Sequence, residues 1–181
     1  MLNPGYVEPG PSKINTSIYV YNIRGFVVST GQYSVDFYLH FKWNPDEVPV
    51  SSSDQIASFD LMNGRIDSQK TITNEPGNIW LGVSGTFNKR VDLKDYPVDT
   101  QTMTLEPENS NLNNTVLIYV ADTTESSLDK DVQVLGWVIK GWEIYTTDHF
   151  YPSFDETYTR IVYKMTITGI SPSFSKQCCR L

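Results

Sequence analysis

Apolar and polar residues alternate along much of this chain with a period of two, the pattern of β-strands that bury one face. Residues 33–43 show the pattern most clearly. One face of this predicted strand carries large apolar side chains and is expected in the core: Val35, Phe37, Leu39, Phe41 and Trp43. The other face carries Ser34, Asp36, Tyr38, His40 and Lys42. Residues 158–170 repeat the alternation, with a predicted core face of Ile161, Tyr163, Met165 and Ile167.

Shorter strands are predicted at residues 17–26, 79–87, 102–105, 116–120 and 134–145. Segments rich in turn-forming residues separate them, at 44–49, 74–77, 107–114 and 122–130. The sequence shows no amphipathic helix of ordinary length and no internal repeat. Short strands with frequent turns between them predict an all-β fold, an antiparallel β-sandwich.

Length and charge narrow the class of protein further. The chain has 181 residues, which suits one domain with a single core. Its net charge of −7 makes nucleic acid a poor candidate partner. No run approaches the roughly 20 apolar residues that cross a bilayer, and residues 1–13 lack the basic start and apolar run of a signal peptide. We expect any membrane attachment to run through a segment that this chain lacks.

The residues that usually carry catalysis are sparse. There are two histidines, His40 in a predicted strand and His149 in a predicted loop, and neither has metal-ligand spacing around it. We expect both to be ordinary surface residues. Nucleophile-elbow, phosphate-loop and dinucleotide-binding motifs are absent from the sequence. Cys178 and Cys179 are adjacent and too close to the C-terminus to staple the fold. We expect no enzymatic activity, no metal and no cofactor.

One segment points to a family. Residues 91–101 read VDLKDYPVDTQ, an aliphatic-Asp run followed by Tyr-Pro-x-Asp-x-Gln. This segment resembles the signature loop of the Cys-loop receptors. The two cysteines that flank the loop in that family fall on Lys89 and Met103, so the disulfide is missing, as in the prokaryotic-type branch. Further landmarks follow in the family's order, at 17–23, 35–43 with Trp43, 59–64, Gly136-Trp137 and 171–174, so the resemblance covers roughly residues 15–176.

The resemblance implies the extracellular ligand-binding domain of a pentameric ligand-gated ion channel, a β-sandwich of about ten strands. Five copies would form a homopentamer that binds a small ligand between neighbours and gates a membrane pore absent from this chain. Residues 1–14 would be an extended lead-in, 15–176 the domain, and 177–181 a tail where the first membrane helix would begin. The domain would lie on the extracellular or periplasmic side. The loops that contact the pore would include Ser29, Thr30, Tyr96, Pro97 and Asp99.

The family's ligand-binding positions can be carried over residue by residue. Tyr38 and Trp80 fall on the complementary face of the subunit interface. On the principal face, the capping loop would span 146–157, with its two aromatic positions on Phe150 or Tyr151 and on Tyr158. Met62 and Ser110 stand where the family has a tyrosine and a tryptophan. Tyr38, Tyr158 and the net negative charge suggest a cationic amine, which aromatic faces attract by about 0.5–2 kcal/mol per contact.

Other interpretations stay open at this point. A naturally soluble pentameric binding protein with no pore would have the same fold and site. An adhesion or carbohydrate-binding module would also use surface aromatics, and it predicts a monomer that binds sugars. For single residues, the alternatives are that Trp80 lies in the core of the sandwich and that Tyr38 and Tyr158 are ordinary solvent-facing strand residues. Trp43 and Trp137 are expected to be packing residues.

Overall fold

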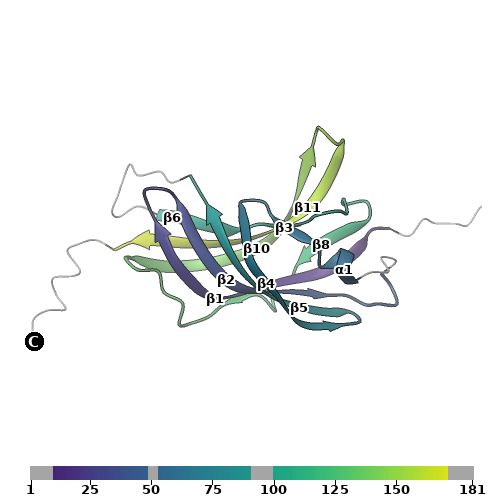
Figure 1. Cartoon of the computed structure of the whole chain (residues 1–181), viewed down its shortest axis with the longest axis horizontal. Coiled ribbons are helices and arrows are strands. Elements are labelled where there is room, and N and C mark those ends of the chain that lie inside the picture. The colour runs from purple at the N-terminus through teal and green to yellow at the C-terminus, as the bar shows by residue number, and fades with distance from the viewer. Residues whose placement is uncertain (1–9, 49–52, 91–99, 171–181) are drawn as a thin grey trace, which may run out of the picture.

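Eleven strands form two facing sheets in the computed structural model, which describes residues 10–48, 53–90 and 100–170 (Figure 1). Sheet A has the order β4 (Gly64–Glu75), β5 (Asn78–Asn88), β2 (Gln32–Lys42), β1 (Ser12–Val27) and β8 (Leu117–Ala121), with β9 (Ser127–Leu128) beside β1. Sheet B has the order β10 (Trp137–Tyr151), β11 (Glu156–Gly169), β7 (Pro107–Asn109) and β3 (Phe59–Leu61), with β6 (Thr100–Leu105) beside β11. The prediction of an all-β sandwich is confirmed.

Most neighbouring strands run antiparallel, but β1 runs parallel to both β8 and β9. A purely antiparallel sandwich is therefore wrong at this edge of sheet A. The chain passes from β7 in sheet B to β8 in sheet A, and β8 then pairs in parallel with the start of β1. Ser12 pairs with Leu117 there, so β1 begins ahead of the predicted domain start at residue 15.

The core lies between the sheets and follows the predicted alternation. In β2, Val35, Phe37, Leu39 and Phe41 are fully buried, and Trp43 packs partly buried just beyond the strand's end. In β11, Ile161, Tyr163, Met165 and Ile167 are fully buried as well. Trp137 is buried in the same cluster, which confirms it as a packing residue. Alternation thus located the core correctly in both long strands.

Three buried tyrosines reach out from strands to main-chain carbonyls elsewhere in the fold. The hydroxyl of Tyr33 donates to Thr104 O at 2.7 Å, that of Tyr119 to Ile56 O at 2.6 Å, and that of Tyr163 to Ser127 O at 3.0 Å. Each hydrogen bond gives a buried hydroxyl a partner and so offsets the free-energy cost of removing that hydroxyl from water. Burial raises the pKa of all three phenols, that of Tyr33 to about 12.

The expectation for the two histidines is met in part, since His149 is exposed but His40 is not. His40 was expected at the surface, but it is buried beneath the side chains of Trp80 and Glu125, which stand on the same side of sheet A. A strand's outer face is solvent-exposed only where no neighbouring side chain crosses it. His149 lies in β10, not in a loop, because the predicted capping loop 146–157 is mostly a hairpin of β10 and β11 that turns at residues 152–155.

Several elements were not predicted. The edge strand β4 was missed, and the segments 107–114 and 122–130, predicted as turns, contain β7 and β9. The helix α1 (Ser53–Ile56) has four residues. Within the described ranges, no helix has the length and apolar character needed to cross a membrane.

A tight Pro76-Gly77 turn joins β4 to β5 at the end of sheet A, as predicted for residues 74–77. Gly77 has a φ of 79°, and a Cβ there would stand 2.6 Å from Trp43 O. We expect Gly77→Ala to lower the free energy of unfolding by about 1–3 kcal/mol, because it adds both backbone strain and a clash. Urea unfolding measures the change.

Gly141→Ala is the matched control for this substitution. Gly141 lies in the strand β10, where a Cβ meets nothing within 4 Å, and its φ is outside the left-handed region. We expect Gly141→Ala to leave the free energy of unfolding unchanged or slightly higher. Equal losses in the two variants would show that the geometry at Gly77 is not the cause.

Candidate functional site

The outer face of sheet A carries a row of aromatic side chains, Tyr21, Tyr19, Tyr38 and Trp80, called here the aromatic row. Tyr38 lies at its centre, with ring centroids 4.8 Å from Tyr21, 6.2 Å from Tyr19 and 6.4 Å from Trp80. Strand register sets these contacts, because Tyr19 is the direct cross-strand partner of Tyr38. The structure therefore brings the predicted residues Tyr38 and Trp80 together on one face. Trp80 is half-buried on that outer face, so it is not part of the core.

Trp80 rests on the buried imidazole of His40, with ring centroids 4.1 Å apart and planes 11° from parallel. His40 Nε2 lies 2.8 Å from Asn78 Oδ1, and Nδ1 lies 3.1 Å from Glu125 Oε2. Contacts on both ring edges fix the imidazole, which in turn fixes the indole. A hollow of about 660 Å³ opens beside these side chains. The aromatic row thus ends in a preformed concave surface.

The other end of the row is tied to a carboxylate. The hydroxyl of Tyr19 donates a short hydrogen bond to Asp129, which also accepts from Asp131 N at 2.8 Å. The hydrogen bond from Tyr19 lowers the pKa of Asp129, and the same bond raises the pKa of Tyr19. Asp129 is consequently ionised at neutral pH and holds a negative charge close to the row.

Sheet B carries a second cluster, called here the glutamate–tyrosine cluster, made of Glu108, Tyr151, Tyr158, Arg160 and their partners. Tyr151 and Tyr158 face each other across the β10–β11 hairpin, edge to face, with centroids 5.7 Å apart. Tyr151 donates to Glu108 Oε1 at 2.7 Å. Arg160 Nε donates to Glu108 Oε2 at 3.0 Å, and this pair is set by the β7–β11 register.

Further carboxylates complete this cluster. Arg160 also pairs with Glu106 at 3.4 Å, and Tyr158 donates to Glu156 Oε2 at 2.8 Å. The cluster thus holds three carboxylates and one guanidinium, which pairs with Glu106 and Glu108, so its net charge is negative. Burial raises the pKa of Tyr151, and the hydrogen bond to Glu156 raises that of Tyr158. Both phenols thus stay protonated and donate to carboxylates at physiological pH.

The remaining predicted site residues lie around this cluster. Phe150 is 52% exposed and precedes Tyr151 in β10, so alternation turns it to the opposite face. Of the two candidates for that position, Tyr151 is the one in the cluster. Met62 is 41% exposed in the turn after β3, and its amide donates to Glu106 O at 3.0 Å. Ser110 directly follows β7 and is half-buried, with its amide bonded to Ser58 O.

Of the residues predicted to couple binding to a pore, Ser29 and Thr30 belong to neither cluster. Ser29 and Thr30 are exposed in the β1–β2 turn. The bond from Lys89 N to Gly31 O, at 3.0 Å, places this turn beside the end of β5. Tyr96, Pro97 and Asp99 lie outside the described residues, as do the rest of the 91–99 segment and both cysteines.

The two clusters belong to different sheets, and in the described parts of the chain no ring contact joins the aromatic row to the glutamate–tyrosine cluster. The sequence predicted Tyr38 and Trp80 in the row and Tyr151 and Tyr158 in the cluster. It missed Tyr19, Tyr21, the carboxylates and Arg160. The alternation in β1 could have identified Tyr19 and Tyr21 as outer-face residues. Nothing local in the sequence marks Glu108 and Arg160 as partners, since 52 residues separate them.

No protein-family model matches this sequence, and no curated protein matches it. The fold and the two clusters described above are therefore the basis for a functional assignment. The sequence resemblance rests on short segments, and the structure adds the positions of particular side chains to it. Geometry of this kind can be tested one residue at a time.

Proposed function

We propose that this chain is the extracellular ligand-binding domain of a pentameric ligand-gated ion channel, of the Cys-loop superfamily and without the loop disulfide. The ordered sequence landmarks and the β-sandwich support the proposal. The observation that carries it is the presence of two aromatic clusters on different sheets of one subunit. Each is half of a pocket, and a ring of identical copies sets one half against the other half from a neighbour.

The ligand would be a small cationic amine held between copies. Aromatic faces attract ammonium groups by about 0.5–2 kcal/mol per good contact. The aromatic row offers Tyr38 and Trp80, and the glutamate–tyrosine cluster offers Tyr151 and Tyr158 next to excess carboxylate. Negative charge within a partly desolvated pocket adds attraction for a cation and repels an anion.

Arg160 does not reverse this preference for cations. Its guanidinium is only 14% exposed and is already paired with Glu106 and Glu108. An anionic ligand would have to displace one of these carboxylates and leave it unpaired. The cluster therefore favours an amine over a carboxylic acid of similar size.

Binding would act on a pore through the ends of the sandwich, and the domain would bind its ligand without transforming it. Figure 1 shows the far end of the β10–β11 hairpin standing away from the body of the fold, where a ligand can draw it inward. The β1–β2 turn with Ser29 and Thr30 and the segment 94–99 would contact the membrane part. The domain would then lie on the extracellular or periplasmic side.

A second candidate is a carbohydrate-binding module, favoured by the partly exposed aromatic row, in which Tyr21 is 38% exposed. Sugars stack on tyrosine and tryptophan faces in open sites. This candidate requires only one copy of the chain and makes no use of the carboxylates on sheet B. A soluble pentameric binder with no pore would use the same interfacial site as the receptor.

The test begins with light scattering over a concentration series, followed by calorimetry with propylamine, tetramethylammonium and propionate on the assembled ring. We expect a ring of five copies that binds the two cations and not the anion. Tyr38→Ala and Tyr158→Ala should each weaken amine binding by about 2- to 30-fold, as the loss of one cation–π contact of about 0.5–2 kcal/mol predicts.

Tyr145→Ala is the matched control for these variants, since Tyr145 is a 43% exposed tyrosine on β10 outside the cluster. It should bind amines as the parent does. An assembled ring that binds no amine, or one whose affinity ignores both Tyr38→Ala and Tyr158→Ala, would overturn the site. A monomer that binds sugars through Tyr38 would favour the carbohydrate module.

A further inference from the structure

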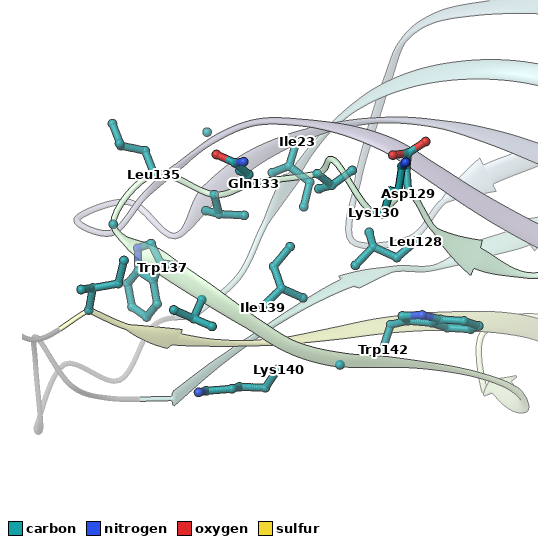
Figure 2. Close-up of a pocket in the computed structure, with 17 residues that line it drawn as sticks. Ile23, Leu128, Asp129, Lys130, Gln133, Leu135, Trp137, Ile139, Lys140 and Trp142 are labelled. Carbon is teal, nitrogen blue, oxygen red and sulfur yellow. The ribbon is translucent and has the colours of Figure 1, made fainter. Parts of the chain in front are cut away.

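A cavity of about 840 Å³ lies within a single copy of the domain, and its lining shares only Asp129 with the aromatic row and its partners (Figure 2). It is open on one side and lies between the chain segment 128–136, the β1 strand and the first half of β10. The segment 128–136 crosses from sheet A to sheet B at this edge of the sandwich. The cavity is therefore bounded by parts of both sheets.

The cavity wall is mainly apolar. The apolar residues that line it are Ile23, Leu128, Val132, Val134, Trp137, Val138, Ile139, Trp142 and Ile170, while Leu135 at its rim is 98% exposed. In Figure 2, Ile23 and Ile139 project toward the space between the 128–136 segment and β10. Close-packed interiors rarely leave a void larger than a water molecule. The volume instead falls in the range of about 300–1,000 Å³ that is typical of small-molecule pockets.

Glycines at the cavity wall leave the space open. A Cβ added at Gly25, Gly136 or Gly141 would meet no atom within 4 Å. Gly25 lies in the register shift between Ile23 and Phe26 of β1, and Gly141 follows a similar shift in β10. Bulges bend the strands that carry them. Backbone irregularities therefore border the cavity on both sides, in β1 and in β10.

The charges around the cavity are compensated. Asp129 and Lys130 stand next to each other at one end, and Asp129 is also bonded to Tyr19 and to Asp131 N. Lys140 projects away from the space in Figure 2. No uncompensated charge among the lining side chains turns inward, in contrast to the negative glutamate–tyrosine cluster. An ion would lose its hydration here without gaining a partner.

We propose that this cavity is a second binding site, which takes a compact, uncharged, apolar molecule within one copy of the chain. It differs from the interfacial amine site in its walls, in its ligand class and in its need for only one copy. This site requires neither assembly into a ring nor a membrane pore, so a failure of the proposed receptor function would leave it untouched.

The test uses N-phenyl-1-naphthylamine, an uncharged dye that fluoresces in apolar surroundings. We expect saturable binding to the domain, with energy transfer from tryptophan. Trp142→Phe should reduce that transfer more than Trp43→Phe does, because Trp142 lines the cavity and Trp43 lies at the other hollow. Val132→Phe and Ile139→Phe add bulk at the wall, and together they should weaken dye binding at least about tenfold.

Ile72→Phe is the matched control, an apolar residue that is 51% exposed on β4 and not part of the cavity wall. It should bind the dye as tightly as the parent. Circular dichroism verifies folding, and either single variant replaces the double variant if the latter does not fold. Absence of saturable binding overturns the proposal. Affinity unchanged by every wall substitution, or equal loss of transfer in Trp142→Phe and Trp43→Phe, overturns it too.

Discussion

Raising the pH above about 10 is expected to unfold the sandwich over a narrow range, because three buried phenols must then ionise. Burial raises the pKa of Tyr33, Tyr119 and Tyr163, that of Tyr33 to about 12. The folded state therefore keeps protons that the unfolded chain loses above its pKa of about 10. Stability is complete below that pH and declines as the pH rises toward the folded pKa values.

Linkage gives the rough size of this effect. Each phenol contributes about 1.4 kcal/mol per pH unit while it is ionised only in the unfolded chain, so three phenols contribute about 4 kcal/mol per unit. Between pH of about 10 and 12 the loss then exceeds the stability of many domains of this size. Urea unfolding at a series of pH values measures it, and tyrosinate absorbance reports when the phenols ionise.

Tyr33→Phe separates this effect from general alkaline damage. The variant lacks one of the three phenols and should lose stability about one third less steeply with pH. Tyr145→Phe, at a tyrosine that is 43% exposed, should follow the parent curve. If the parent and Tyr33→Phe declined with the same slope, ionisation of buried phenols would not be the cause.

Arg160→Met is expected to lower the free energy of unfolding by about 3–5 kcal/mol. Glu108 is 4% exposed and would be left as a buried carboxylate without its cation. Tyr151 would remain as a donor, but one neutral hydrogen bond does not replace a charged partner. Urea unfolding at neutral pH measures the loss.

Two controls separate burial from simple charge removal. Combining Arg160→Met with Glu108→Gln removes the stranded charge and should recover much of the lost stability. Lys164→Met breaks an ion pair on the same strand, between side chains that are 34% and 57% exposed, and should cost less than about 1 kcal/mol. Equal losses in Arg160→Met and Lys164→Met would contradict a special role for the buried pair.

The parts of the fold that the sequence predicts best are the long central strands. In β2 and β11 one face is buried against the other sheet, so large apolar residues must recur at every second position. The edge strand β4 lacks this signal. Most of its side chains are exposed, and it pairs with β5 on one side only. Backbone hydrogen bonds to β5 hold it in place, so its sequence does not need to alternate between apolar and polar residues.

The very short strands escaped prediction for a different reason. β3 and β7 have three residues each and pair with each other across a long sequence separation. β7 contains Pro107, a residue that signals a turn when only local sequence is considered. Such strands exist because tertiary pairing fixes them, and a local pattern of three residues cannot reveal that.

The candidate site likewise contains residues that the sequence could predict and residues that it could not. The face of Tyr38 was predictable because alternation along β2 gives it, whereas Trp80 was placed by the family resemblance, since β5 lies beside β2 without directly following it in the chain. Glu108 could not be predicted, because it pairs with Arg160 only when β7 lies beside β11, and the sequence does not show that pairing. His40 shows the converse error, since polar residues on an outer face become buried when neighbouring side chains cover them.

The parallel pairing of β1 with β8 has a consequence for how the chain is made. Residues 12–16 leave synthesis early, but their partners at 117–121 follow about a hundred residues later. Until then β1 and β2 form a ribbon with an open edge, which is a template for pairing with other chains. Closure of sheet A is therefore a late event in folding. Any shortened form of the chain that ends before β8 would keep that adhesive edge permanently.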